Sequence, residues 1–171
     1  MEVLKYPAPA LRRGGKPVET FDAALAATAR EMLDTMYRQR GVGLAAPQVG
    51  LELDLLVLNE TGERGDGSGE MVLVNPEIVT KKGHEFGEEG CLSFPGLYAE
   101  VQRSKKIVVK YRDLEGQEQE MVAEDFLARI IQHEIDHLKG VVFVDRLSSV
   151  EKLRVRTRLQ DMERSFQASG A

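Results

Sequence analysis

Two histidines separated by three residues are the part of this sequence with the clearest chemical potential. The segment reads His133-Glu134-Ile135-Asp136-His137. On a helix, positions i and i+4 share one face, so both imidazoles can bind a single metal ion. Glu134 would then lie beside a water that the ion activates, and its carboxylate could take the proton and pass it to a leaving amine. The pattern predicts a metal-dependent hydrolase.

The residues around this motif predict a buried helix from about Glu124 to Leu138. Ile130, Ile131 and Ile135 give it an apolar face, and Gly140 lies just beyond the expected end. A buried helix rarely carries four ionisable residues out of five without a functional reason. The alternative is an amphipathic helix whose histidines and acids are solvated.

Two histidines leave the ion short of ligands, so the third ligand decides the class of site. The single cysteine, Cys91, lies in the segment Glu89-Gly90-Cys91-Leu92-Ser93, and His84 is the remaining histidine. We favour Cys91, because a thiolate and two imidazoles leave one tetrahedral position open, as a catalytic site requires. Glu151 is a weaker candidate, and for Cys91 alone the alternative is a small buried core residue.

The rest of the chain predicts an α+β fold. Helices and strands do not alternate regularly, which argues against a doubly wound parallel sheet. We expect mostly antiparallel sheets around a central metal-binding helix, with N-terminal and C-terminal helices, in one domain over residues 1–171. The other expected elements are a helix at 22–38, loops at 41–50 and 61–70, strands at 53–58, 71–74, 107–111 and 118–123, a hairpin turn at 113–116, a short β-branched strand at 141–144 and a helix at 150–166.

Composition excludes several classes of protein. The 171 residues are 42% hydrophobic and 30% charged, with a net charge of -5, so no general attraction to nucleic acid is expected. The sequence has no apolar run near the roughly 20 residues that cross a bilayer, and its N-terminus lacks the apolar core of a signal peptide. One cysteine allows no intrachain disulfide. We therefore expect a cytoplasmic protein with no membrane partner.

Three blocks of the sequence, in this order, resemble the motifs of the peptide deformylase family. They are Gly41–Gln48 (GVGLAAPQ), Glu89–Ser93 (EGCLS) and Gln132–Leu138 (QHEIDHL). The likeness extends to Tyr6-Pro7, Asn75-Pro76 and the stretch from Gly140 to Leu147, so it covers nearly the whole chain. It implies an enzyme that removes the formyl group from the N-terminal formyl-methionine of newly synthesised proteins and releases formate.

The resemblance assigns a metal site and a base. Cys91, His133 and His137 would hold the ion, with Fe²⁺ as the working metal. Zn²⁺, Ni²⁺ or Co²⁺ would be possible substitutes, because this ligand set suits all of them. Glu134 would act first as general base and then as general acid.

The resemblance also assigns the groups that stabilise developing charge. The side-chain amide of Gln48 and the backbone N–H of Leu92 would donate to the oxyanion that forms at the formyl carbon. Glu89 and Arg103 would form a structural salt bridge near the site, and Asp136 would orient a ligand or pair with a cation.

A peptide substrate needs a backbone partner and a pocket for methionine. Gly41 and Gly43 would let their loop approach the extended peptide closely, which in this family pairs like an added strand. Helical spacing places Phe126 and Ile130 on the face of His133, where they could line the methionine pocket opposite Val42. Plain core packing is an equally good interpretation of each.

Two further features lie outside these motifs. Tyr98 stands where some family members have arginine, and a tyrosine there would stack or hydrogen-bond in place of a charged contact with the peptide backbone. The last predicted helix is basic, and it could bind ribosomal RNA or simply be solvated. Its basic residues are Lys152, Arg154, Arg156, Arg158 and Arg164.

Two other functions compete with the deformylase interpretation. A zinc endopeptidase would use the same histidines and would not need Cys91. A structural zinc site would use His84 as a fourth ligand beside Cys91, His133 and His137, with no open position and with metal-dependent folding.

Overall fold

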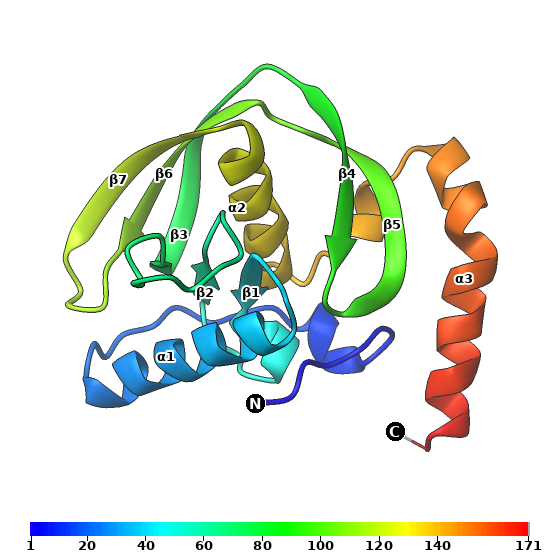
Figure 1. The fold of residues 1–171 in the computed structure, drawn as a ribbon, viewed down its shortest axis with the longest axis horizontal. Coiled ribbons are helices and arrows are strands. Elements are labelled where there is room, and N and C mark those ends of the chain that lie inside the picture. The colour runs from blue at the N-terminus through cyan, green and yellow to red at the C-terminus, as the bar shows by residue number, and fades with distance from the viewer. Residues whose placement is uncertain (171) are drawn as a thin grey trace.

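The computed structural model describes residues 1–170 and confirms the α+β class (Figure 1). Five antiparallel strands form one sheet in the order β1-β2-β3-β6-β7, and β4 and β5 form a separate hairpin. Helix α2 lies between the sheet and the hairpin, α1 runs along one edge of the molecule and α3 lies beside β5 (Figure 1). The elements are α1 Ala23–Arg38, β1 Gly43–Ala45, β2 Leu55–Leu58, β3 Met71–Lys82, β4 Glu85–Cys91, β5 Phe94–Arg103, β6 Lys106–Arg112, β7 Glu118–Glu124, α2 Asp125–Leu138 and α3 Ser149–Ala168.

Several local expectations were wrong. The predicted loop at 41–50 contains strand β1 and a 3₁₀ helix, Ala46–Val49. The β-branched run at 141–144 is no strand and leads into a 3₁₀ helix, Phe143–Arg146. Strands β4 and β5 were not predicted at all, and β3 continues eight residues beyond Val74 through bulges in its pairing with β6. In each case long-range pairing and packing overrode the local pattern.

Strand β2 joins the two main hydrophobic cores. Leu55 and Val57 point to the face that α1 covers, where they pack with Met32, Leu33 and Met36 of that helix. Leu56 and Leu58 point to the opposite face, where they pack with residues of α2. The side chains of a strand alternate between its faces, so a strand with helices on both sides is apolar throughout. This sandwich fixes α2 against the sheet.

The C-terminal end of α2 is held by a glycine that no other residue could replace without strain. Gly140 has φ +71°, and the N–H of Val141 donates to the carbonyl of Asp136, which closes the helix in a Schellman motif. A Cβ at Gly140 would lie 2.4 Å from the carbonyl oxygen of Arg12. The last turn of α2, which carries His137, is therefore tied to the N-terminal segment.

Helix α3 packs through a third core around β5. Val155 is its one fully buried residue, and it joins Phe94 and Phe143. The hydroxyl of Tyr6 also donates to Glu163 at 2.6 Å. Within residues 1–170 we find no helix that is both long and apolar enough to cross a membrane.

Candidate metal centre and active-site cleft

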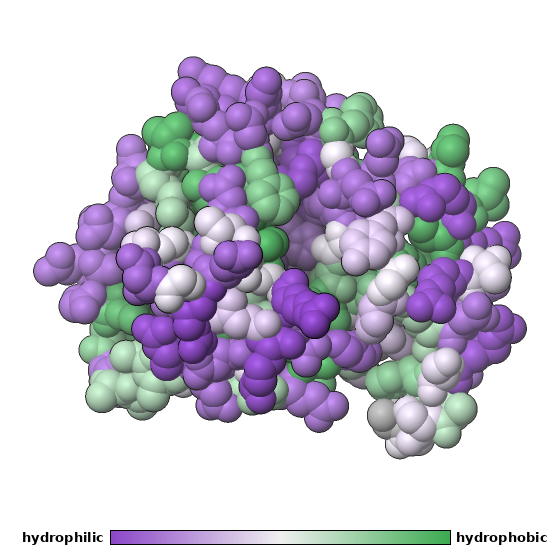
Figure 2. Space-filling model, viewed as in Figure 1, coloured by the Kyte–Doolittle hydropathy of each residue, from purple (hydrophilic) through white to green (hydrophobic). Residues whose placement is uncertain are grey.

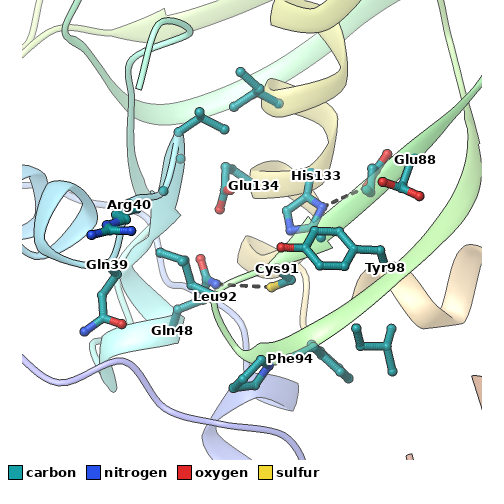
Figure 3. Close-up of a pocket in the computed structure, with 18 of the residues that line it drawn as sticks. Gln39, Arg40, Gln48, Glu88, Cys91, Leu92, Phe94, Tyr98, His133 and Glu134 are labelled. Atoms are coloured by element: carbon teal, nitrogen blue, oxygen red, sulfur yellow. Dashed lines mark hydrogen bonds and ion pairs between the residues drawn. The ribbon is translucent and has the colours of Figure 1, made fainter. Parts of the chain in front are cut away.

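The three predicted ligands meet between α2 and the β4–β5 hairpin. His133 and His137 lie one turn apart on α2, and Cys91 is the last residue of β4. Figure 3 shows Cys91 close to His133. Their donor atoms all lie within 4.8 Å of one another, and Cys91 Sγ is 3.4 Å from His137 Nε2. Ligands on one tetrahedral ion lie roughly 3–4 Å apart, given metal–ligand bonds of about 2.0–2.3 Å. The arrangement therefore fits a divalent ion.

A buried charge network orients His133. Its Nδ1 lies 2.8 Å from Glu89 Oε1, which leaves Nε2 as the ring nitrogen that can bind a metal ion. Arg103 binds both carboxylate oxygens of Glu89 at 2.9 Å and reaches Asp136 at 2.7 Å, and Arg129 Nη1 binds Glu89 at 2.7 Å. Burial would raise the pKa of Glu89, but hydrogen bonds from Arg103 and His133 outweigh it and hold that pKa well below its usual range. The expected ion pairs of Glu89 and Asp136 are confirmed.

Two buried atoms of the site have no hydrogen-bond partner among the described residues. They are His137 Nδ1 and Glu134 Oε2. Burial lowers the pKa of His137 well below its usual value, which favours the neutral imidazole that metals bind. Burial also raises the pKa of Glu134 to about 7. A carboxyl group with this pKa can accept and return a proton near neutral pH.

Hydrogen bonds fix the orientation of the Gln48 amide. Its Oε1 accepts from the N–H of Ala45 at 2.9 Å, so its NH₂ group must point the other way. That group lies 3.2 Å from Ser93 Oγ and 3.5 Å from Cys91 Sγ (Figure 3). The hydrogen-bond donor of Gln48 therefore already points toward the three metal-ligating side chains in the absence of substrate. The part played by Ser93 was not foreseen, because only the folded hairpin brings it to Gln48.

Close backbone approach explains the two glycines of the first motif. A Cβ at Gly43 would lie 2.6 Å from Glu134 Oε1, and a Cβ at Gly41 would lie 2.7 Å from a methyl carbon of Leu92. Both contacts are shorter than those real Cβ atoms make. The segment therefore passes directly over the carboxylate of Glu134.

The site opens into a cleft of 550 Å³. Figure 2 shows the cleft as a hollow near the centre of the face turned toward the viewer. All five predicted substrate-binding residues line it, namely Gly41, Val42, Gly43, Phe126 and Ile130. Strand β1 lies at one edge of the sheet and, among residues 1–170, pairs with β2 alone. Apart from the Ala45 N–H, which donates to Gln48, its other edge is free to bind an extended chain.

The other proposed ligands lie elsewhere. His84 is exposed in the turn between β3 and β4 and does not belong to the donor group. Glu151 accepts from the N–H of Glu100 at 2.9 Å and pairs with Arg154. Neither a fourth protein ligand nor a Glu-based third ligand is present among residues 1–170.

Further cleft residues were missed from the sequence. Lys5, Gln39, Arg40 and Glu88 line the cleft, although none belongs to a motif or a periodic pattern. Arg40 directly precedes the first glycine motif, and this position was the only available signal.

Comparisons with known proteins agree with this geometry. The sequence model of the polypeptide deformylase family matches residues 1–153. A peptide deformylase from Chromobacterium violaceum is 45% identical over 164 residues, which are 96% of each chain. The crystal structure of a plant peptide deformylase, PDF1B, superposes with a TM-score of 0.96 at 40% identity, over 99% of this chain and 92% of the other. A peptide deformylase structure from Legionella pneumophila gives a TM-score of 0.87 at 46% identity, over 98% and 96%.

The fold and the matches place this protein in a family of metal-dependent hydrolases. The chain belongs to the polypeptide deformylase family.

Proposed function

We infer that this protein hydrolyses the formyl group from the N-terminal formyl-methionine of newly synthesised proteins and releases formate. Family membership supports this activity over almost the full length of the chain. The observation that carries it within the site is Glu134, whose buried Oε2 has no partner among residues 1–170 and which lines the cleft beside Cys91 and His133 of the Cys-His-His group.

We propose that Cys91, His133 and His137 hold one Fe²⁺ ion, with Zn²⁺, Ni²⁺ or Co²⁺ as substitutes. One thiolate and two imidazoles suit all four metals, and three protein ligands leave a position open. When bound, such an ion polarises the formyl carbonyl and lowers the pKa of the attacking water.

The chain's own groups then move the protons and stabilise the charge. Glu134 takes a proton from the water as the water oxygen bonds to the formyl carbon. The amide of Gln48 and the N–H of Leu92 donate hydrogen bonds to the resulting oxyanion. Glu134 next gives the proton to the methionine nitrogen as the C–N bond breaks. The products are formate and a free amino terminus. The fixed amide of Gln48 supports its role, because its NH₂ group needs no reorientation.

We propose that the nascent chain binds as an extended strand along the free edge of β1. Gly41 and Gly43 have no side chain to obstruct its approach. Val42 and Ile130 would contact the methionine side chain. Ile130 is 4% exposed, whereas Phe126 is 47% exposed and stands at the rim. An apolar pocket of this kind binds methionine by burial of its flexible thioether chain.

Formate release from a formyl-Met-Ala-Ser peptide tests this function. We expect anaerobically prepared, iron-loaded protein to release formate, and its Glu134→Ala variant to retain the metal and release almost none. Cys91→Ala should lose bound metal, measured by elemental analysis. An inactive wild type would contradict the deformylase function, and metal retention by Cys91→Ala would favour an endopeptidase-like site.

We further propose that α3 contacts the ribosome. Arg154 and Arg158 are already engaged, because they donate to the carbonyls of Tyr98 and Pro95. Lys152 and Arg156 are exposed and form no side-chain hydrogen bond or ion pair with residues 1–170.

A double variant of these two free cations tests the ribosome contact. Lys152→Gln/Arg156→Gln should weaken salt-sensitive cosedimentation with ribosomes. The same charge change on β3, Lys81→Gln/Lys82→Gln, should leave it intact. Equal binding by both variants would remove the proposal.

An enzyme that acts on nascent chains would work in the cytoplasm, and we propose that residues 1–171 form one catalytic domain.

A further inference from the structure

Arg40 occupies a backbone position that favours glycine. It follows α1, its N–H donates to the carbonyl of Tyr37, and the N–H of Gly41 donates to that of Met36. This is the turn that ends many helices, and its left-handed residue is usually glycine. Arg40 adopts it with φ +58°, a conformation that a residue with a Cβ enters at a cost. Backbone strain of this kind at a cleft suggests that the side chain has a role.

The side chain of Arg40 stands at the cleft and has no charged partner. It is exposed and lines the cleft, and it forms no ion pair or side-chain hydrogen bond with the other described residues. Figure 3 shows Arg40 and Gln39 on one side of the cleft, with Tyr98 and Glu88 on the opposite side. Glu134 and Gln48 lie between these two sides.

The direction of β1 places Arg40 beside the residues that follow methionine. From Gly43 the strand runs inward to Ala45, which is bonded to Gln48. A peptide with its formyl group at Glu134 and its chain antiparallel to β1 runs outward, past Gly43 toward Arg40. An extended chain advances roughly 3.3 Å per residue, so its second and third residues lie opposite the segment from Gly43 back to Arg40.

The charges along this path favour an acidic peptide. Arg40 and Lys5 are exposed cations of the cleft, and Lys5 already donates to the carbonyl of Leu92 at 2.7 Å. Glu88 is the one exposed acid that lines it, because Glu89 and Glu134 are both buried and Glu89 is paired with Arg129. The exposed side chains of the cleft therefore carry two positive charges and one negative charge, whereas the net charge of the chain as a whole is -5.

We propose that Arg40 gives this deformylase a preference for nascent chains with an aspartate or glutamate at the second or third residue. The inference rests on the proposed deformylase function. An exposed ion pair contributes modestly, so the carboxylate substrate should be favoured about two- to fivefold in kcat/KM over its lysine counterpart. The preference should vanish at 1 M salt, where the Debye length is about 3 Å.

The test compares amidated peptides, so that no terminal carboxylate interferes. The ratio of kcat/KM is measured for formyl-Met-Glu-Ala-NH₂ against formyl-Met-Lys-Ala-NH₂, and for the Met-Ala-Glu and Met-Ala-Lys pair. We expect a wild-type ratio above one in at least one pair, a ratio near one for Arg40→Gly, and an inverted ratio for Arg40→Glu. Arg38→Gln changes the same charge two residues away, outside the cleft lining, and should keep the wild-type ratio.

Thermal unfolding separates a substrate contact from a structural role. Because glycine suits the left-handed conformation, the Tm of Arg40→Gly should not fall. A wild-type ratio of one in both pairs, an unchanged ratio in Arg40→Gly, or a loss of preference with a lower Tm would each overturn the proposal. If the wild type releases no formate from any of the four peptides, the deformylase function itself fails. Formate release without a charge preference refutes the role of Arg40 alone.

Discussion

Adding a single methyl group at Gly43 should displace the proposed catalytic carboxylate. The new Cβ would lie 2.6 Å from Glu134 Oε1, whereas ordinary contacts begin at 3.4 Å, so the two must separate by about 0.8 Å. Glu134 is only 5% exposed, and its surroundings limit where it can go. A misplacement of about 1 Å can reduce a rate by roughly 10²-fold, or about 2.7 kcal/mol of transition-state stabilisation. We expect a loss of that order in kcat for Gly43→Ala.

A double-mutant cycle with Glu134→Ala isolates this contact. In that background the clashing carboxylate is gone, so Gly43→Ala should reduce formate release little further. Gly41→Ala is the matched control, because its Cβ meets the end of Leu92 instead of Glu134. Metal content and Tm show whether the site is intact. An equal loss from Gly43→Ala with and without Glu134 would refute a mechanism that acts through the carboxylate.

Two other changes test the supports of the site. Glu89→Gln leaves Arg129 without a buried counter-charge and Arg103 with Asp136 alone, and it should lower the free energy of unfolding by about 3–5 kcal/mol in urea titrations. The folded-state pKa of Glu89 is depressed, so its contribution to the free energy of unfolding is complete above its unfolded pKa of about 4.5 and is lost as the pH falls toward the folded-state pKa. A wild-type urea midpoint that stays constant from pH 6 to pH 3 would contradict this. Tyr6→Phe removes the hydrogen bond to Glu163 and should lower stability by about 1 kcal/mol, with activity in vitro retained; an unchanged urea midpoint would show that this bond does not help to hold α3.

The sequence determined the elements whose pattern is local. The apolar period and the spacing of His133 and His137 predicted α2 and the side of it that carries both histidines, because a helix fixes the relation of i to i+4 whatever surrounds it. The helix expected at 22–38 is present as α1, and the side chain of Asp22 caps it by accepting from the N–H of Leu25. The turn at 113–116 likewise connects β6 and β7 as predicted. The family motifs then carried these local predictions to a function.

Only the tertiary structure decided which distant residues meet. Strands β4 and β5 were missed because β4 is rich in glycine and glutamate, and their mutual pairing stabilises what intrinsic propensity does not. That hairpin brings Glu89 to His133 and Ser93 to Gln48, more than 40 residues away in sequence. Arg40 reaches the cleft through a left-handed turn that no local pattern predicts for an arginine. Local spacing determines the geometry within one element, whereas contacts between elements depend on how all of them pack together.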